Sequence, residues 1–165
     1  MKRVLLDTNI YGRLVLDNTR SKIKERLENP KHFVVYGTHI IRKELRNTPK
    51  KIRIGNVGLR NDLLQVYDEI TKGRMLPITP FEHEIADHYF KLYKELKGKC
   101  SKEELFHDFL LVACAAHHRL DIVVSDDART LLSGSALKAY TLVHAIKNLP
   151  TPRFLLYEEF KKQLM

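Results

Sequence analysis

The chain has 165 residues, of which 44% are hydrophobic and 30% are charged, a balance that fits a globular protein and excludes a disordered or fibrous one. No apolar run approaches the roughly 20 residues that span a bilayer, and the chain starts directly with a strand pattern. We therefore expect a cytoplasmic protein with no membrane anchor and no signal peptide. The formal net charge of +9 favours a polyanionic partner, nucleic acid before a membrane surface.

The first part of the sequence alternates short apolar strands with amphipathic helices. Asp7 ends the first strand and can cap the helical segment that follows it, and Thr38 is a good N-cap for a later helix. The order strand, helix, strand, helix predicts a parallel sheet with helical crossovers. The basic, glycine-containing stretch 50–58 is expected to be a loop. Strands are expected at 3–6 and 32–36, and helices at 21–29 and 40–47.

Two helical patterns occupy the middle of the chain, where apolar residues recur at helical spacing over 59–70 and over 81–96. No linker-like tract isolates them from the rest. We therefore expect an inserted helical arm, about residues 57–98, within a single domain that spans residues 1–165.

The next segment contains a helix and a strand that carry acidic residues. Residues 109–116 are all apolar without Gly or Pro, which predicts a helix buried on most faces. Ser101 and Glu104 form a capping box at its start, so Asp108 lies about two turns inside the helix. The strand 122–124 then leads into Ser125, Asp126 and Asp127. After it we expect a short helix at 128–132, a break at Gly134, a helix at 136–147, a strand at 153–156 and a helix at 157–163.

Four carboxylates lie at positions that a parallel sheet with flanking helices can bring together. Asp7 and Asp127 each follow a strand, whereas Glu44 and Asp108 each interrupt the apolar side of a helix. The carboxyl ends of parallel strands lie at one edge of a sheet, so these acids can meet there. Clustered carboxylates repel one another, and a hard divalent cation relieves that repulsion. One or two Mg²⁺ or Mn²⁺ ions would polarise a phosphodiester and activate a water, which predicts a metal-dependent nuclease.

In order along the chain, these motifs resemble those of PIN-domain ribonucleases, including VapC-type toxins of toxin–antitoxin modules. The resemblance covers Lys2 to about Thr130. It implies a three-layer α/β/α sandwich with a central, mostly parallel sheet, cleavage of RNA, an antitoxin partner and a homodimer. It also implies a catalytic and metal-binding set. The motif residues are Asp7-Thr8-Asn9, Thr38 to Glu44-Leu45, Asp108 to Ala116, and Val123 to Asp127, with Asp7, Glu44, Asp108 and Asp127 as the catalytic metal ligands.

Several further residues are expected to support this site. Asn9 would orient Asp7, and Ser125 would position a carboxylate or a water, as the family pattern implies. Asp126 is secondary, and Glu104 either supports Asp108 from the same helix face or serves only as a cap. The basic residues of the 50–58 stretch either bind backbone phosphates or form a solvated loop, namely Lys50, Lys51 and Arg53.

Other interpretations stay open at this point. A degenerate PIN fold could serve as an RNA-binding or partner-binding module, although the presence of all four acids argues against it. Phosphatase-like aspartate chemistry needs a second Asp two residues after Asp7, where Asn9 stands. His117 and His118 could touch phosphate, but we interpret them as partners of a helix dipole. The group His83, Glu84, Asp87 and His88 is interpreted as a solvated helix face rather than a metal site.

Overall fold

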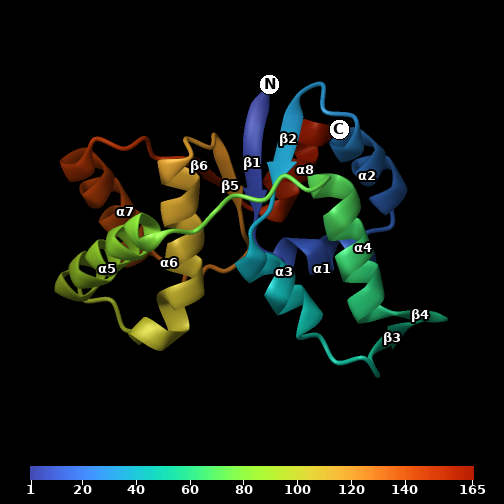
Figure 1. Ribbon diagram of the computed structural model, residues 1–165, viewed down its shortest axis with the longest axis horizontal. Coiled ribbons are helices and arrows are strands. Elements are labelled where there is room, and N and C mark those ends of the chain that lie inside the picture. The colour runs from blue at the N-terminus through green and yellow to red at the C-terminus, as the bar shows by residue number, and fades with distance from the viewer.

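The computed structural model describes residues 1–165, and its centre is a parallel sheet (Figure 1). The sheet order is β2-β1-β5-β6, with every neighbouring pair parallel. Strand β1 is central and pairs with β5 from Val4↔Ile122 to Leu6↔Val124. This arrangement confirms the predicted parallel α/β sheet. The strands are β1 (Lys2–Leu6), β2 (Phe33–Tyr36), β5 (Ile122–Val124) and β6 (Arg153–Leu155).

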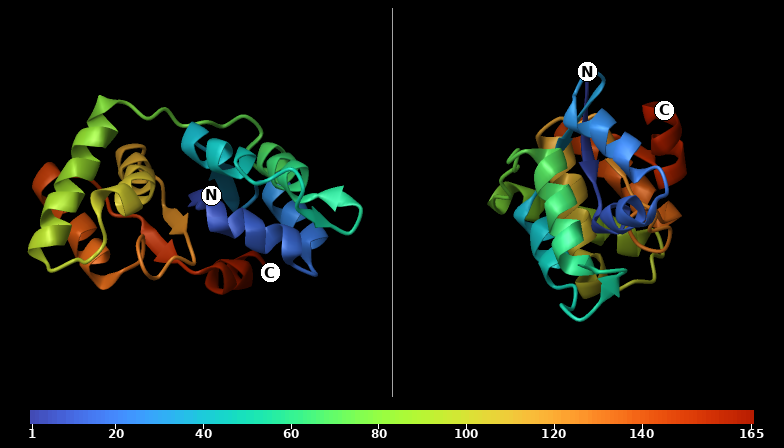
Figure 2. Two further views of the ribbon diagram at one scale, coloured as in Figure 1. Left: turned by 90° about the horizontal axis from the view of Figure 1, so that it is seen from below. Right: turned by 90° about the vertical axis from the view of Figure 1, so that its right-hand side faces the viewer.

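Eight helices flank this sheet. They are α1 (Thr8–Leu16), α2 (Arg20–Glu28), α3 (His39–Arg46), α4 (Leu59–Thr71), α5 (Pro80–Glu95), α6 (Lys102–His117), α7 (Gly134–Lys147) and α8 (Tyr157–Leu164). Figures 1 and 2 show α1 to α4 gathered on the β2 side of the molecule and α5 to α7 on the β6 side. None of the helices combines the length and the apolar character needed to span a bilayer.

The ends of the helices follow from their capping residues. Thr38 Oγ1 accepts a hydrogen bond from the backbone N–H of Ile41, 3.2 Å away, at the start of α3. At α6 the predicted capping box forms, since the Ser101 hydroxyl accepts from the Glu104 N–H and the Glu104 carboxylate accepts from the Ser101 N–H. Both caps fix the position at which an acid-bearing helix leaves its loop.

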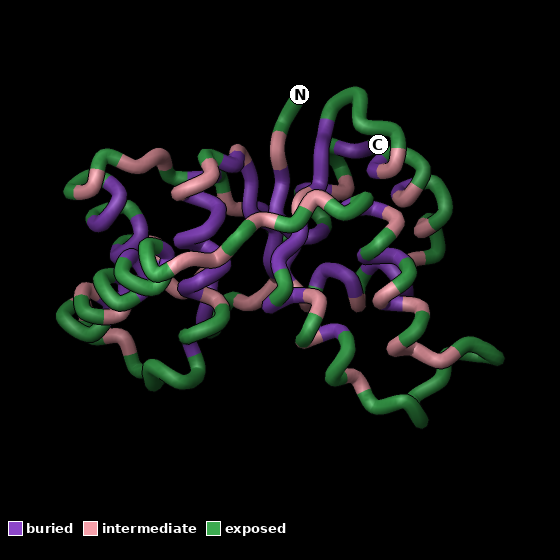
Figure 3. The backbone as a smooth tube through the Cα atoms, in the orientation of Figure 1, coloured by how far each residue is buried: buried purple, intermediate pink, exposed green.

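The hydrophobic core lies between the sheet and the helices on its two sides. In Figure 3 the buried parts of the backbone gather on the strands and on α6. Residues 109–116 of α6 are each at most 2% exposed, which confirms the prediction of a helix buried on most faces. An apolar run of this length stabilises the fold by the area it removes from water. A carboxylate at the edge of this run, such as Asp108, is therefore held on a rigid element.

The structure differs from the sequence prediction in two connecting segments. The 50–58 stretch contains a small antiparallel hairpin of β3 (Arg53–Ile54) and β4 (Val57–Gly58), turning through Gly55 with a positive φ. Residues 128–132 form turns instead of the expected short helix. Gly134 was expected to separate two helices, but it is the first residue of α7. The helix begins there because the Ser133 hydroxyl accepts a hydrogen bond from the Ala136 N–H and caps it.

The two helices between β2 and β5 pack in different places. Helix α4 packs against α1, α2 and α3, whereas α5 packs against α6 and α7. The segment between them crosses the molecule in Figure 1 and forms an isolated parallel bridge from Met75 to Gly37. The helices expected as one inserted arm are thus shared between the two helical groups.

Candidate active site

Asp7 begins the site at the carboxyl end of β1. Its carboxylate caps α1 by accepting the Thr8 N–H at 2.8 Å, and only 5% of the residue is exposed. The Ser125 hydroxyl donates to Oδ2 of Asp7 at 2.7 Å, and the Asn9 amide lies 3.3 Å from the same oxygen. Because β1 and β5 are adjacent strands, Ser125 reaches across the edge of the sheet. The neighbours expected of Asp7 from the sequence are therefore beside it.

Asp127 and Asp108 meet at a single hydroxyl. Thr130 Oγ1 lies 2.5 Å from Oδ2 of Asp108 and 2.5 Å from Oδ2 of Asp127. Asp127 also accepts the backbone N–H groups of Arg129 and Thr130, which fixes the turn after β5. The Thr130 hydroxyl therefore lies between the two carboxyl groups and holds them close together. No local sequence pattern pointed to Thr130 as part of the site.

Glu44 approaches from α3 and is held by two groups. Thr8 Oγ1 donates to its Oε2 at 2.7 Å, and His107 Nδ1 lies 2.8 Å from its Oε1. These contacts join residues 36 and 63 positions apart in the chain. No local pattern signals them, which is why Thr8 and His107 were not expected to hold Glu44.

Burial and the charges of neighbouring acids raise the pKa values of Asp7 and Asp108. Burial raises the pKa of Asp7 to about 6, with the charges of Glu44 and Asp127 adding to the rise, although hydrogen bonds from Ser125 and Thr8 oppose it. Burial also raises the pKa of Asp108 to about 7, and the nearby charges of Asp7, Asp127 and Glu44 contribute, against the Thr130 hydrogen bond. The structure therefore brings together acids from four separate elements. The charges of Glu44 and Asp127 disfavour ionisation of Asp7 and Asp108.

These residues suit a hard divalent cation, because they offer only oxygen ligands and their carboxylates are oriented by hydroxyl groups. No three of the four acids place ligand atoms within 4.8 Å of one another. Mg²⁺ usually keeps several waters and takes only one or two carboxylates directly, so that spacing is compatible with it. Asp7, Glu44, Asp108 and Asp127 are the residues that would hold such an ion.

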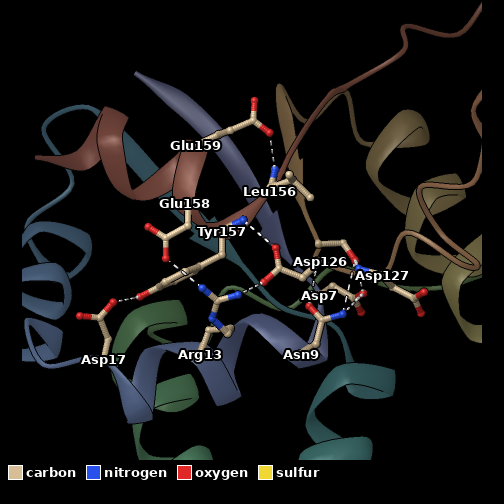
Figure 4. A network of polar contacts seen from close by, with 11 residues as sticks. Asp7, Asn9, Arg13, Asp17, Asp126, Asp127, Leu156, Tyr157, Glu158 and Glu159 are labelled. Carbon is tan, nitrogen blue, oxygen red and sulfur yellow. Dashed lines mark hydrogen bonds and ion pairs between the residues drawn. The ribbon is translucent and has the colours of Figure 1, made fainter.

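Asp126 makes its contacts away from this group, and Figure 4 shows its carboxylate directed toward Arg13 and Tyr157. Its Oδ1 accepts the backbone N–H of Tyr157 at 2.9 Å, and its Oδ2 pairs with Arg13 at 2.5 Å. Arg13 also pairs with Glu158 and lies over the Tyr157 ring, 4.7 Å from the centroid. Asn9 Oδ1 accepts the Asp126 N–H. Asp126 thus connects the start of α8 to α1 and the sheet, while Asp127 next to it faces Thr130.

The other residues expected near the site lie elsewhere. Glu104 contacts Ser101 and pairs with Arg129 at 2.7 Å, and the structure gives it no contact with Asp108. The basic residues Lys50, Lys51 and Arg53 are exposed on the segment from α3 into the β3–β4 hairpin. On α5, Glu84 and Asp87 form surface ion pairs with lysines, Lys147 and Lys102.

A groove beside Glu44 was not foreseen from the sequence. It has a volume of about 400 Å³, and its lining combines apolar side chains with several basic ones. Imidazole and ammonium groups at these positions can contact phosphate oxygens. The basic lining residues are His39, Lys43, His83 and His107.

Fold and site together define an α/β protein with an acidic cluster at the carboxyl edge of a parallel sheet. The PIN domain family model matches residues 4–132, a range that contains all four acids, and the chain belongs to the PIN domain family. PIN domains are generally nucleases. Among curated proteins, none matches this chain closely.

Two solved structures are similar to the chain over nearly its whole length. A chain in the structure of FitAB bound to an IR36 DNA fragment matches with a TM-score of 0.57 and 16% identity, covering 93% of this chain and 94% of the other. A chain of VapBC2 from Rickettsia felis, bound to a DNA fragment from its promoter, matches with a TM-score of 0.52 and 14% identity. That match covers 93% of this chain and 98% of the other. At these identities the likeness shows the shared fold.

Proposed function

We propose that this protein is a divalent-metal-dependent endoribonuclease that hydrolyses RNA phosphodiester bonds and acts as the toxin of a toxin–antitoxin module. The observation that carries the proposal is the meeting of Asp7, Glu44, Asp108 and Asp127, which come from two strand ends and two helices. An acidic cluster of this kind is unfavourable by itself. Membership of a family of nucleases supports a hydrolytic role for it.

The roles of the residues follow from their contacts. When bound, Mg²⁺ or Mn²⁺ supplies a Lewis acid for the phosphate and lowers the pKa of a bound water. Asp7 and Asp108 sit on rigid, buried elements and hold their carboxylates in fixed positions. Ser125 and Thr130 donate to these carboxylates and set their orientation. Hydroxyl groups that orient ligating carboxylates are part of a metal site as much as the ligands are.

The charge of the protein supports a nucleic-acid substrate. A net charge of +9 raises the local concentration of a polyanion around the molecule. The groove beside Glu44 supplies basic groups where a phosphate backbone would enter, including Lys43 and His107. The choice of RNA over DNA depends on the resemblance to PIN ribonucleases.

The proposed partner is an antitoxin, and the proposed assembly is a homodimer in complex with it. The antitoxin is supported by the similarity to chains from structures of FitAB and VapBC2, 94% and 98% of which are covered. The homodimer depends on the resemblance to PIN ribonucleases. The test is coexpression with the product of an adjacent small gene, followed by co-purification and measurement of nuclease activity. We expect the two proteins to purify together and cleavage to be suppressed.

The decisive experiment for the enzyme is cleavage of RNA by the Asp108→Asn variant. We expect cleavage in Mg²⁺ or Mn²⁺, no cleavage in EDTA, and a loss of at least about 100-fold in the variant, because even groups that only orient a metal ligand contribute 10–100-fold. The matched control is Glu103→Gln, an exposed carboxylate on the same helix, which should cleave normally. RNA cleavage that continues in EDTA would overturn the metal dependence, and cleavage retained by Asp108→Asn would overturn the site.

A further inference from the structure

A second group of metal-binding side chains lies where the start of α5 meets the end of α6. Glu82, in the first turn of α5, has no solvent exposure. One oxygen of its carboxylate, Oε2, accepts the Thr79 N–H at 2.7 Å and the Thr79 hydroxyl. The other, Oε1, contacts Nδ1 of His117 and lies 3.5 Å from Nε2 of His118. His117 is the last residue of α6, and His118 is its C-cap.

We propose that Glu82, His117 and His118 form a zinc site that is separate from the acidic cluster. Their ligand atoms all lie within 4.8 Å of one another, and these are the only three such groups that do so. Two imidazoles and one carboxylate are a ligand set that Zn²⁺ accepts in tetrahedral sites, with a water in the fourth position. Imidazole ligands favour Zn²⁺ over Mg²⁺, which prefers oxygen ligands alone.

The carboxylate of this group is oriented in advance. Thr79 holds Oε2 through its backbone and its hydroxyl, so Oε1 keeps its direction toward the two histidines. Ligating carboxylates in metal sites are commonly fixed by such outer hydrogen bonds. The C-terminal end of α6 carries the negative end of its helix dipole, which favours a cation beside His117 and His118.

An ion can reach this group from solvent. The side chains of His117 and His118 are 36% and 24% exposed, although Glu82 is buried. Asp108 precedes His117 by nine residues on the same helix, a rise of about 13 Å, so an ion here is not shared with the acidic cluster. The Pro77 carbonyl oxygen lies 3.3 Å from His118 Nε2, and metal binding replaces that contact.

A bound ion would join two segments of the protein, the first turn of α5 and the end of α6. We therefore expect Zn²⁺ to raise the melting temperature of the protein. At a hundredfold excess over the dissociation constant, the rise should be about 5–10 °C. Mg²⁺ at the same concentration should not produce it.

The test is calorimetric titration of Zn²⁺ into the untagged 165-residue protein in excess Mg²⁺. We expect one saturable site in the wild-type protein and affinity at least about 100-fold weaker in Glu82→Gln and in His118→Gln. Two controls should bind Zn²⁺ as the wild type does. The first is His88→Gln, an exposed histidine on α5, and the second is Asp108→Asn, which alters the acidic cluster.

Two results would overturn the zinc site. The first is the absence of saturable Zn²⁺ binding, or its retention in both Glu82→Gln and His118→Gln; the three side chains would then be an ion pair that caps α5. The second is loss of binding in Asp108→Asn, which would assign the ion to the acidic cluster. Should the first two variants fail to fold, Co²⁺ bound to Asp108→Asn decides, because tetrahedral absorption bands support the site and octahedral bands overturn it.

Discussion

Thr130 is the residue that joins two of the acids, and it does so with one hydroxyl group. Its Oγ1 lies 2.5 Å from carboxylate oxygens of both Asp108 and Asp127. If the acids hold a metal, Thr130 fixes the geometry of two ligands without binding the ion itself. A substitution at Thr130 therefore tests whether the hydrogen bonds that orient Asp108 and Asp127 contribute to activity.

Replacement of this hydroxyl by a methyl group, Thr130→Val, should reduce RNA cleavage by about 10–100-fold at fixed Mg²⁺. The shape of the side chain is kept, so the fold should persist. Cleavage measured against Mg²⁺ concentration checks the prediction, with Thr141→Val on the surface of α7 as the control. An unchanged Mg²⁺ requirement would show that Thr130 does not orient the ligands.

Asp108 gives a second prediction, on stability against pH without metal. Its folded-state pKa is about 7 against an ordinary value of 3.8, chiefly because it is buried. Between these pH values the folded protein holds a proton that the unfolded chain has lost, so the free energy of unfolding falls as the pH rises from about 4 to about 7. Asparagine has no proton to lose. Asp108→Asn should therefore be more stable than the wild type above pH 7, by on the order of 4 kcal/mol, and equally stable near pH 4.

The measurement is the difference in unfolding free energy between the two proteins in EDTA across this range. The two proteins must be compared because His144 gives both of them the opposite pH dependence of the unfolding free energy. Burial lowers the pKa of His144 to about 4, so its contribution to stability is lost as the pH falls from 6.5 to 4. A difference that does not change with pH would contradict the raised pKa of Asp108.

Among the secondary-structure elements, α8 is held at the edge of the sheet by contacts of the Asp126 carboxylate. The carboxylate accepts the first N–H of α8, at Tyr157, and pairs with Arg13 of α1. An acid at a helix start satisfies an N–H group that has no partner within the helix. Asp126 and Asp127 are neighbours in sequence with different tasks in the structure.

Asp126→Ala should therefore lower stability by about 1–2 kcal/mol while leaving the Mg²⁺ requirement of cleavage unchanged. Asp127→Ala, by contrast, should change the Mg²⁺ requirement. Urea unfolding and cleavage assays on both variants check the pair. If Asp126→Ala loses cleavage without losing stability, its carboxylate acts in the site after all.

Most elements were predictable because their signals are local. A few neighbouring residues are enough to predict each of three features: the β-branched strand 122–124, the Ser101 capping box and the apolar run of α6. The error at 128–132 has a physical reason. Asp127 accepts the N–H groups of Arg129 and Thr130 and so stabilises turns over a helix, an effect that depends on its side-chain conformation.

At the scale of the whole molecule, the positive charge gives a prediction on binding. RNA affinity of the inactive Asp108→Asn protein should fall with salt, because phosphate contacts release counterions. In that background, Lys43→Gln, at the groove beside Glu44, should reduce the slope of log affinity against log salt by about 0.7. Fluorescence anisotropy with a labelled RNA measures it. Lys138→Gln, on α7, is the control. Equal slopes for the two variants would show that RNA does not contact the groove beside Glu44.

The site was predictable only in part. Two acids follow strands and two interrupt helices, and the topology of a parallel sheet brings such positions to one edge. The partners of these acids could not be predicted, because Thr8 with Glu44 and Thr130 with Asp108 are contacts between distant parts of the chain. The group at Glu82 was missed for the same reason, since its histidines lie 35 and 36 residues away.

The pairing of β1 with β5 joins the beginning of the chain to a segment more than a hundred residues later. During synthesis, a ribosome must pass residue 124 before Val124 can dock beside Leu6 and bring Asp127 to Asp7. A nascent chain, or a fragment cut before β5, therefore lacks Asp127 and one wall of the acidic cluster. Translation must pass β5 before the four acids can come together.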